Sequence, residues 1–176
     1  MATTMILTFT AHDRPGVVEL LSKTVALNGG NWLESRMAHL AERFAGVARI
    51  DVADDVAGDL EKSLLELKDE GFHIFVERTS PVVTDQDITC FELDIVGPDR
   101  SGLMMELTKC LASLHISVEE METSIKPAPV SGGTFFHAKI IFSARADIDE
   151  QDLADKLQSL GETMHVDMDL SKPALL

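Results

Sequence analysis

A short motif occurs twice in the chain, and its residue types suit the binding of a small charged molecule. Gly16 and Gly102 each follow an Asp-Arg pair and precede an apolar segment with helical spacing. The first N–H groups of a helix lack intrahelical partners and favour an anion, and glycine lets a ligand approach the backbone closely. The carboxylate of a free amino acid suits such a position. The motif residues are Asp13-Arg14-Pro15-Gly16 and Asp99-Arg100-Ser101-Gly102.

The charged residues of the motif have both a binding and a structural interpretation. Asp13 and Asp99 have the chemistry to bind an ammonium group, but an aspartate just before a helix is also a favoured cap. Arg14 and Arg100 suit a carboxylate clamp, although an ion pair with a surface acid is the more frequent outcome for exposed arginines. The glycines can also serve only a tight turn. The sequence leaves these alternatives open.

Neighbouring polar residues extend the candidate site. Asn31 offers a carbonyl oxygen to an ammonium group and an amide to a carboxylate, so it could contact the other end of the same molecule. His12 directly precedes the motif. The second copy has Ser101 in place of Pro15 and Ser117 in place of Asn31, which predicts a different ligand there or none. The candidate ligand-binding residues are His12, Asp13, Arg14, Pro15, Gly16, Val17, Asn31, Asp99, Arg100, Ser101, Gly102, Leu103 and Ser117.

The motif belongs to an internal repeat with an offset of 86 residues, from Asp13 to Asp99. Apolar residues alternate before each motif, as in a half-buried strand, and recur at helical spacing after it. Each half then continues with two strands, a helix and a last strand. In the first half these are Asn31–Leu40, Arg43–Val52, a helix from about Leu60 that stops near Gly71, and His73–Arg78. In the second half they are Ser117–Ile125, Thr134–Ala144, a helix from about Leu153 that stops near Gly161, and His165–Leu170.

This order predicts an α+β fold of two tandem ferredoxin-like βαββαβ domains, each a four-stranded antiparallel sheet with two helices on one face. We expect the domains at 1–80 and 88–172, with a linker at 81–87 and a tail at 173–176. The longer hairpin loop at 127–133 is the main difference between the copies. An open sheet face and free sheet edges need a cover, which the other copy or a second chain would supply. A homodimer is therefore expected.

The charge balance excludes one large class of partners. The chain has 15 Lys and Arg against 30 Asp and Glu, a formal net charge of −15. Because nucleic-acid binding requires a surface that neutralises phosphates, direct contact with DNA or RNA is disfavoured. No apolar window approaches the length of a membrane span and no leader pattern opens the chain, so a cytoplasmic protein without membrane contact is expected.

Motifs for catalysis or for metal binding are not evident. The sequence contains no nucleophile elbow, phosphate-binding loop or dinucleotide fingerprint. Two acidic clusters, around Glu119 to Glu122 and Asp54 to Asp59, lack the spacing of a calcium loop and are typical of solvated faces. Cys90 and Cys110 form no ligand pair. We therefore predict no enzyme activity, no cofactor and no metal.

The repeated unit resembles a known family. A βαββαβ unit with D-R-P-G between its first strand and first helix, and Gly30-Asn31 where its second strand begins, looks like the ACT domain, a small-molecule-sensing module. Two such units, with the longer hairpin loop in the second, are similar to the glycine cleavage system transcriptional repressor group of tandem-ACT regulators. The resemblance implies a non-catalytic regulatory protein that binds glycine or a similar amino acid. It also implies a transcription factor as the protein partner.

Three function classes remain open on sequence grounds. The first is the amino-acid-binding regulator just described. The second is a detached ACT regulatory subunit of an amino-acid metabolic enzyme, which would co-purify with that enzyme. The third is a small enzyme or metal-binding stress protein, because ferredoxin-like folds host unrelated functions. The absence of a fused catalytic or DNA-binding segment in this sequence ranks the first two above the third.

Overall fold

The computed structural model describes residues 2–79, 88–128, 132–145 and 147–173. The chain divides into two compact units, Met1–Val83 and Thr84–Leu176. Each unit contains one copy of the repeat, as the internal offset predicts. The linker expected at 81–87 lies outside the described residues, as do 129–131 of the long hairpin loop and 174–176 of the expected tail.

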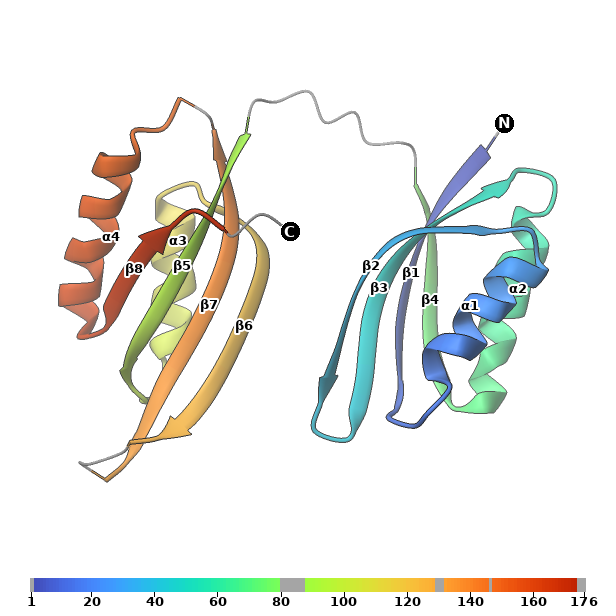
Figure 1. Ribbon diagram of the computed structural model, residues 1–176, viewed down its shortest axis with the longest axis horizontal. Helices are drawn as coiled ribbons and strands as arrows, with labels where there is room; N and C mark the ends of the chain where they lie inside the picture. Colours follow the sequence, from blue (N-terminus) through green and yellow to red (C-terminus); the bar gives the residue numbers. More distant parts are fainter. Residues whose placement is uncertain (1, 80–87, 129–131, 146, 174–176) are drawn as a thin grey trace. The chain divides into compact units, whose positions relative to one another are not determined.

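The first unit is a four-stranded antiparallel sheet with its two helices on one face (Figure 1). The strand order is β2-β3-β1-β4, so the first strand in sequence lies in the middle and β2 and β4 form the edges. This is the predicted ferredoxin-like arrangement. The elements are β1 (Ala2–His12), α1 (Val17–Leu27), β2 (Asn31–Leu40), β3 (Arg43–Ala53), α2 (Ala57–Glu66), the 3-10 turn η1 (Leu67–Glu70) and β4 (Phe72–Thr79).

The second unit repeats this topology with the strand order β6-β7-β5-β8 (Figure 1). Its strands pair antiparallel, and its two sheet edges are β6 and β8. The prediction of two tandem ferredoxin-like domains is therefore confirmed. The elements are β5 (Ile88–Pro98), α3 (Leu103–Ser113), β6 (Ser117–Pro127), β7 (Thr134–Arg145), α4 (Glu150–Met164) and β8 (Asp167–Ser171).

Each core forms between the helices and one face of the sheet. Alternate residues of β1, namely Met5, Leu7 and Phe9, are fully or almost fully buried and meet the apolar stripe of α1 around Leu21. Period-2 burial in a strand and a 3.6-residue stripe on a helix are the two patterns from which the sequence predicted this layer. Trp32 of β2 packs against the margin of the same core.

Helix α4 ends differently from the prediction. We expected a stop near Gly161, but the helix continues through it and ends at Met164, followed by His165 in the left-handed conformation with φ 58°. A Cβ on Gly161 would lie 2.7 Å from the carbonyl oxygen of Val166, so this glycine allows the returning chain to pack closely against the helix. For the same reason the last strand begins at Asp167, not at His165.

Candidate ligand site at the start of the first helix

The turn between β1 and α1 depends on one glycine. Gly16 precedes α1 with φ 92° and ψ −1°, the left-handed region where a Cβ is strained. It makes no side-chain cap, and its carbonyl oxygen accepts the first helical hydrogen bond from the N–H of Leu20, at 2.9 Å. The N–H groups of the first helical turn precede that bond, so they have no partner within the helix.

Arg14 crosses from this turn to the end of η1. Its Nη2 donates a hydrogen bond to the carbonyl oxygen of Glu70, at 2.8 Å, and lies 3.7 Å from the Glu70 carboxylate. This contact follows from the topology, because β4 pairs antiparallel with β1 and brings Phe72 opposite Ala11. The start of β4 therefore lies beside the end of β1. The guanidinium is half exposed, so donors remain accessible from solvent.

A cleft of about 310 Å³ opens at this junction. Arg14, Asp69 and Glu70 all line it, so one small space has residues of both signs of charge. A zwitterion such as a free amino acid carries the complementary pair of charges. The lining residues are Ala11, His12, Arg14, Asp69, Glu70 and Gly71.

Sequence reasoning found only part of this cleft. His12 and Arg14 were predicted site residues, whereas Asp69, Glu70 and Gly71 were not. Gly71 was recognised only as the end of the second helix, and it does end η1 with φ 85°. The signal that could have placed it here is the strand order, since a βαββαβ unit sets its last strand beside its first.

Asp13 connects the turn to the β2–β3 hairpin through two polar contacts. Its N–H donates to the carbonyl oxygen of Glu42 at 3.2 Å, and its carboxylate lies 3.5 Å from Nε2 of His39. The residue that precedes the helix is Gly16, without a side-chain cap, so the alternative in which Asp13 caps α1 does not describe this turn. Helix α4 shows what such a cap looks like, because Asp149 accepts hydrogen bonds from two backbone N–H groups there.

The structure separates Asn31 from the rest of the predicted site in the first unit. Asn31 pairs with Asp51, which pairs in turn with Thr4 at the start of β1. From Thr4 to His12 is eight residues along β1, roughly 26 Å at about 3.3 Å per residue. One small molecule therefore cannot contact both Asn31 and the Gly16 turn of the same unit, contrary to the expectation that Asn31 binds the other end of the ligand.

Two further predicted residues have buried side chains. Val17 is 4% exposed and belongs to the first core, and Leu103 is 2% exposed and belongs to the second. Only the main chain of either residue is available to a ligand. Pro15 and Ser101, at equivalent positions in the two turns, are both exposed.

The corresponding turn of the second unit has the same backbone and different contacts. Gly102 again takes the left-handed conformation, with φ 85°. Arg100, however, binds the carboxylate of Glu106 in its own helix through two hydrogen bonds. This hydrogen-bonded pair raises the pKa of Arg100 and lowers the pKa of Glu106. Asp99 accepts a hydrogen bond from Thr134 at 3.3 Å.

Ser117 does not join that second turn. It pairs with Ser143 of β7, which in turn lies opposite Cys90 near the start of β5. Asp99 follows the other end of β5, so Ser117 is separated from its turn as Asn31 is from the first. The two copies thus agree in placing these strand-start residues away from the motif.

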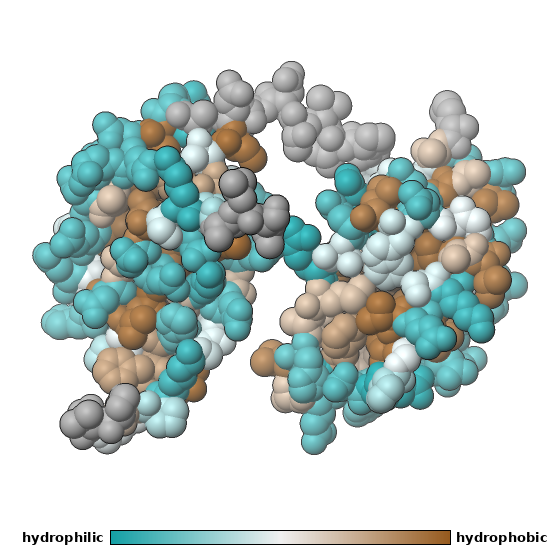
Figure 2. Space-filling model, in the orientation of Figure 1, coloured by the Kyte–Doolittle hydropathy of each residue, from teal (hydrophilic) through white to brown (hydrophobic). Residues whose placement is uncertain are grey.

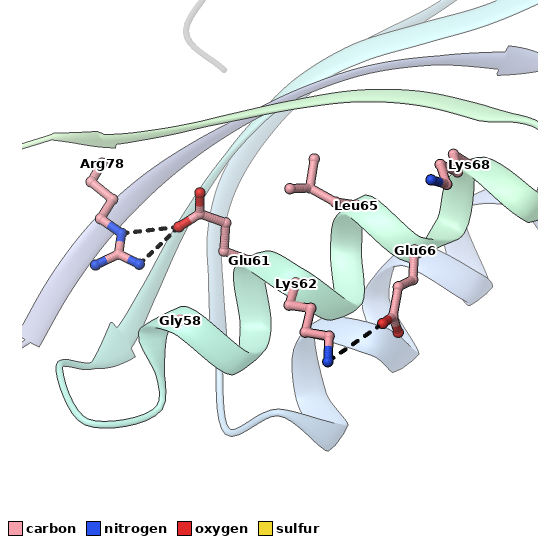
Figure 3. Close-up of a pocket in the computed structure, with 7 residues that line it drawn as sticks. All are labelled: Gly58, Glu61, Lys62, Leu65, Glu66, Lys68 and Arg78. Carbon is pink, nitrogen blue, oxygen red and sulfur yellow. Dashed lines mark hydrogen bonds and ion pairs between the residues drawn. The ribbon is translucent and has the colours of Figure 1, made fainter.

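Another hollow in the first unit lies outside the predicted site. It has a volume of about 340 Å³ and runs along α2 beside β4 (Figure 3). Four of its charged residues form two pairs, Arg78 with Glu61 at 2.8 Å and Lys62 with Glu66 at 3.9 Å. None of the motif residues lines it.

The described residues contain neither a metal-binding cluster nor a membrane-spanning helix. Among residues 2–79, 88–128, 132–145 and 147–173, no group of three or more His, Cys, Asp and Glu is arranged to hold a metal ion. Within the same ranges, no helix has the length and apolar character that a membrane span requires.

Comparison with known proteins relates the first unit to a family. The fold defines the chain as a tandem pair of ferredoxin-like units. The family model of the ACT domain matches residues 3–77, which lie within the first unit. The second unit has the same strand order, which makes the whole chain tandem ACT-like in architecture. No curated protein sequence matches the chain.

Two solved structures are similar over nearly the whole chain. One is a protein of unknown function from Galdieria sulphuraria, with a TM-score of 0.79, 28% identity, and coverage of 99% of this chain and 100% of that one. The other is described as a candidate glycine cleavage system transcriptional repressor, with a TM-score of 0.75, 20% identity, and coverage of 98% and 99%. Both contain two units in the same order, so the tandem fold recurs in other proteins.

Proposed function

We propose that this chain is a non-catalytic regulatory protein that binds glycine or a similarly small amino acid in the cleft beside the Gly16 turn. In this proposal the bound amino acid controls the association of the chain with a transcription factor of the glycine cleavage system in the cytoplasm. No cofactor takes part. The second unit binds a different ligand or none.

The observation that carries the proposal is the pairing of opposite charges in one small cleft. Arg14 lines the cleft and has donors suited to a carboxylate, and Asp69 and Glu70 line it and have acceptors suited to an ammonium group. The start of α1 at Gly16 follows Arg14 by two residues in the chain. A volume of about 310 Å³ lies at the lower end of the range of small-molecule sites.

Charge supports a protein as the downstream partner. A net charge of −15 repels the DNA backbone, so control of a gene would pass through contact with another protein. The amino acid can change that contact only through different affinities for two states of the chain. The pathway is suggested by the name of the similar structure described as a candidate glycine cleavage system transcriptional repressor.

The test is calorimetric titration of the full chain with glycine, serine and threonine, read for affinity and stoichiometry. We expect saturable binding of one small amino acid, with one site per chain in the first unit. Arg14→Gln should weaken that binding by about tenfold or more, because a charge-assisted contact is worth about 1.5 to 3 kcal/mol. Arg100→Gln is the matched control and should leave the affinity unchanged.

Three results would count against the proposal. Binding of none of these amino acids would remove the sensor function. Equal affinity in Arg14→Gln and the unaltered chain would remove the cleft as the site. The protein whose association with the chain responds to glycine could also prove to be a metabolic enzyme and not a DNA-binding protein. That result would favour the detached regulatory subunit.

A further inference from the structure

The sheet of the first unit has an open face with three uncharged residues side by side at its centre. Thr8 of β1 pairs with Val47 of β3 on one side and Phe75 of β4 on the other, so these three residues, the first row, cross the face opposite the helices. Val47 is 41% exposed and Phe75 is 64% exposed. Figure 2 shows tan and brown residues on the sheet side of this unit. Apolar surface gathered in this way marks an interaction site.

The same places in the second unit are charged. Asp94 of β5 pairs with Lys139 of β7 and with Asp169 of β8; these three residues form the second row. Lys139 lies 2.8 Å from Glu92, and this hydrogen bond raises the pKa of Lys139, with smaller contributions from Asp94 and Glu122. Because the fold accepts charges in this row, the uncharged first row is not a requirement of the fold.

Charged residues flank the first row symmetrically. On β3, Arg43 comes four residues before the central residue and Asp51 four residues after it, both on the open face. On β4, His73 and Glu77 come two residues before and two after the central residue. Since β3 and β4 both run antiparallel to β1, Arg43 and His73 lie towards one end of the face, and Asp51 and Glu77 lie towards the other. Arg49, which also lies in the acidic half, is 3.2 Å from Glu34 of β2.

We propose that a second copy of this chain covers the open face of the first unit. A two-fold axis along the first row, perpendicular to the strands, sets that row against the same row of the partner. The same rotation exchanges the two ends, so Arg43 faces Asp51 of the partner subunit and His73 faces Glu77 of the partner subunit. An isologous interface requires such self-complementarity. This surface is separate from the cleft, and the inference goes beyond amino-acid binding.

The geometry of sheet packing fits this arrangement. Two sheets packed face to face lie about 10 Å apart with strand directions within about 30° of each other, so apolar side chains interdigitate at the centre. Arg36, which pairs with Val47 from the edge strand β2, lies at the end of the same row. Because the two packed sheets cross at an angle, their edge strands do not lie directly over each other. The two copies of Arg36 are therefore offset from each other.

The first test is the mass of the full chain in solution, measured by sedimentation equilibrium over a range of concentrations. We expect a dimer that Val47→Glu weakens by about 100-fold or more, because a charge at the centre of a desolvated interface acts as a hot-spot loss. Asp169→Asn, on the second row, is the matched control and should leave the dimer unchanged. Thr8→Glu, at an exposed position of the same row, repeats the test should Val47→Glu fail to fold by circular dichroism.

A charge exchange tests the orientation of the two copies. Arg43→Asp and Asp51→Arg should each weaken the dimer, whereas the double variant should recover most of the affinity, since its two new charges again face each other. A monomeric unaltered chain would overturn the proposal. So would a dimer indifferent to a charge in the first row, because its interface would then lie on another surface.

Discussion

The two units share a fold, and they differ at the turn before the first helix and on the open face of the sheet. Arg14 binds the carbonyl oxygen of Glu70, which ends η1 just before the last strand, whereas Arg100 binds the carboxylate of Glu106 in the helix that follows it. The first row is uncharged and the second row is charged. Both copies thus retain the residues that packing requires. The residues of the surface, in contrast, differ between the copies.

The largest effect is expected where the copies agree. Leu7 and Leu93 hold equivalent places in the two cores and are both 0% exposed. Truncation of either to alanine should cost about 2 to 5 kcal/mol. In urea unfolding, Leu7→Ala should move the fluorescence transition of Trp32, the sole tryptophan, which reports the first unit. An equal movement with Leu93→Ala would show that the two units unfold as one.

A smaller effect is expected at the glycine turns. Gly16→Leu and Gly102→Leu should each cost roughly 1 to 2 kcal/mol, because both positions are left-handed. Neither should disrupt the fold, since a Cβ at Gly16 meets only Glu19, at 4.0 Å, and one at Gly102 meets nothing within 4 Å. Calorimetry should show loss of glycine binding in Gly16→Leu alone. Retained binding in that variant would remove the helix start from the site.

The charged second row predicts an alkaline effect confined to the second unit. Because the folded-state pKa of Lys139 is raised, its pairing stabilises the fold fully below the unfolded-state value, about 10.4, and is lost as pH rises through the folded-state pKa. Lys139→Met should remove this alkaline component from melting curves recorded across a pH series. An unaltered alkaline profile in that variant would show that the pair with Glu92 is not maintained in solution.

The smallest effect is an acid one at the two turn arginines. The lowered pKa of Glu106 makes its pairing stabilising above the unfolded-state value, about 4.3, and this stabilisation is lost as pH falls through the folded-state pKa. Arg100→Gln should flatten that part of the acid profile. Arg14→Gln should not, because the closer acceptor of Arg14 is a carbonyl oxygen that does not titrate. Identical acid profiles for the two variants would contradict this difference.

The fold could be predicted because its determinants are local and occur twice. Strand alternation around Leu7, the helical stripe around Leu21 and the shared motif at Gly16 each indicate one element, and the second copy confirms the order. Gly161 misled the prediction because a glycine that permits close packing and a glycine that ends a helix look alike in sequence. Only the 2.7 Å approach to Val166 separates the two.

The candidate site was less predictable because it joins segments distant in the chain. Asp69 and Glu70 meet Arg14 only through the pairing of β4 with β1. Asn31 looked close to the motif on the assumption that a neighbouring strand starts beside it, but α1 carries the chain to the opposite end of the sheet before β2 begins. The residues of the open faces could not be predicted without the strand register. Periodicity alone does not show that Thr8 pairs with both Val47 and Phe75.

The most direct test of amino-acid binding is a nitrogen-15 NMR titration of the full chain with glycine. We expect saturable shifts at the amides of Arg14 and Gly71, which line the cleft, and of Gly16 in the adjoining turn, with Gly102 unmoved at the same concentrations. Shifts of equal size at Gly16 and Gly102 would contradict the assignment of binding to the first unit. The absence of any shift at saturating glycine would contradict glycine as the ligand of this cleft.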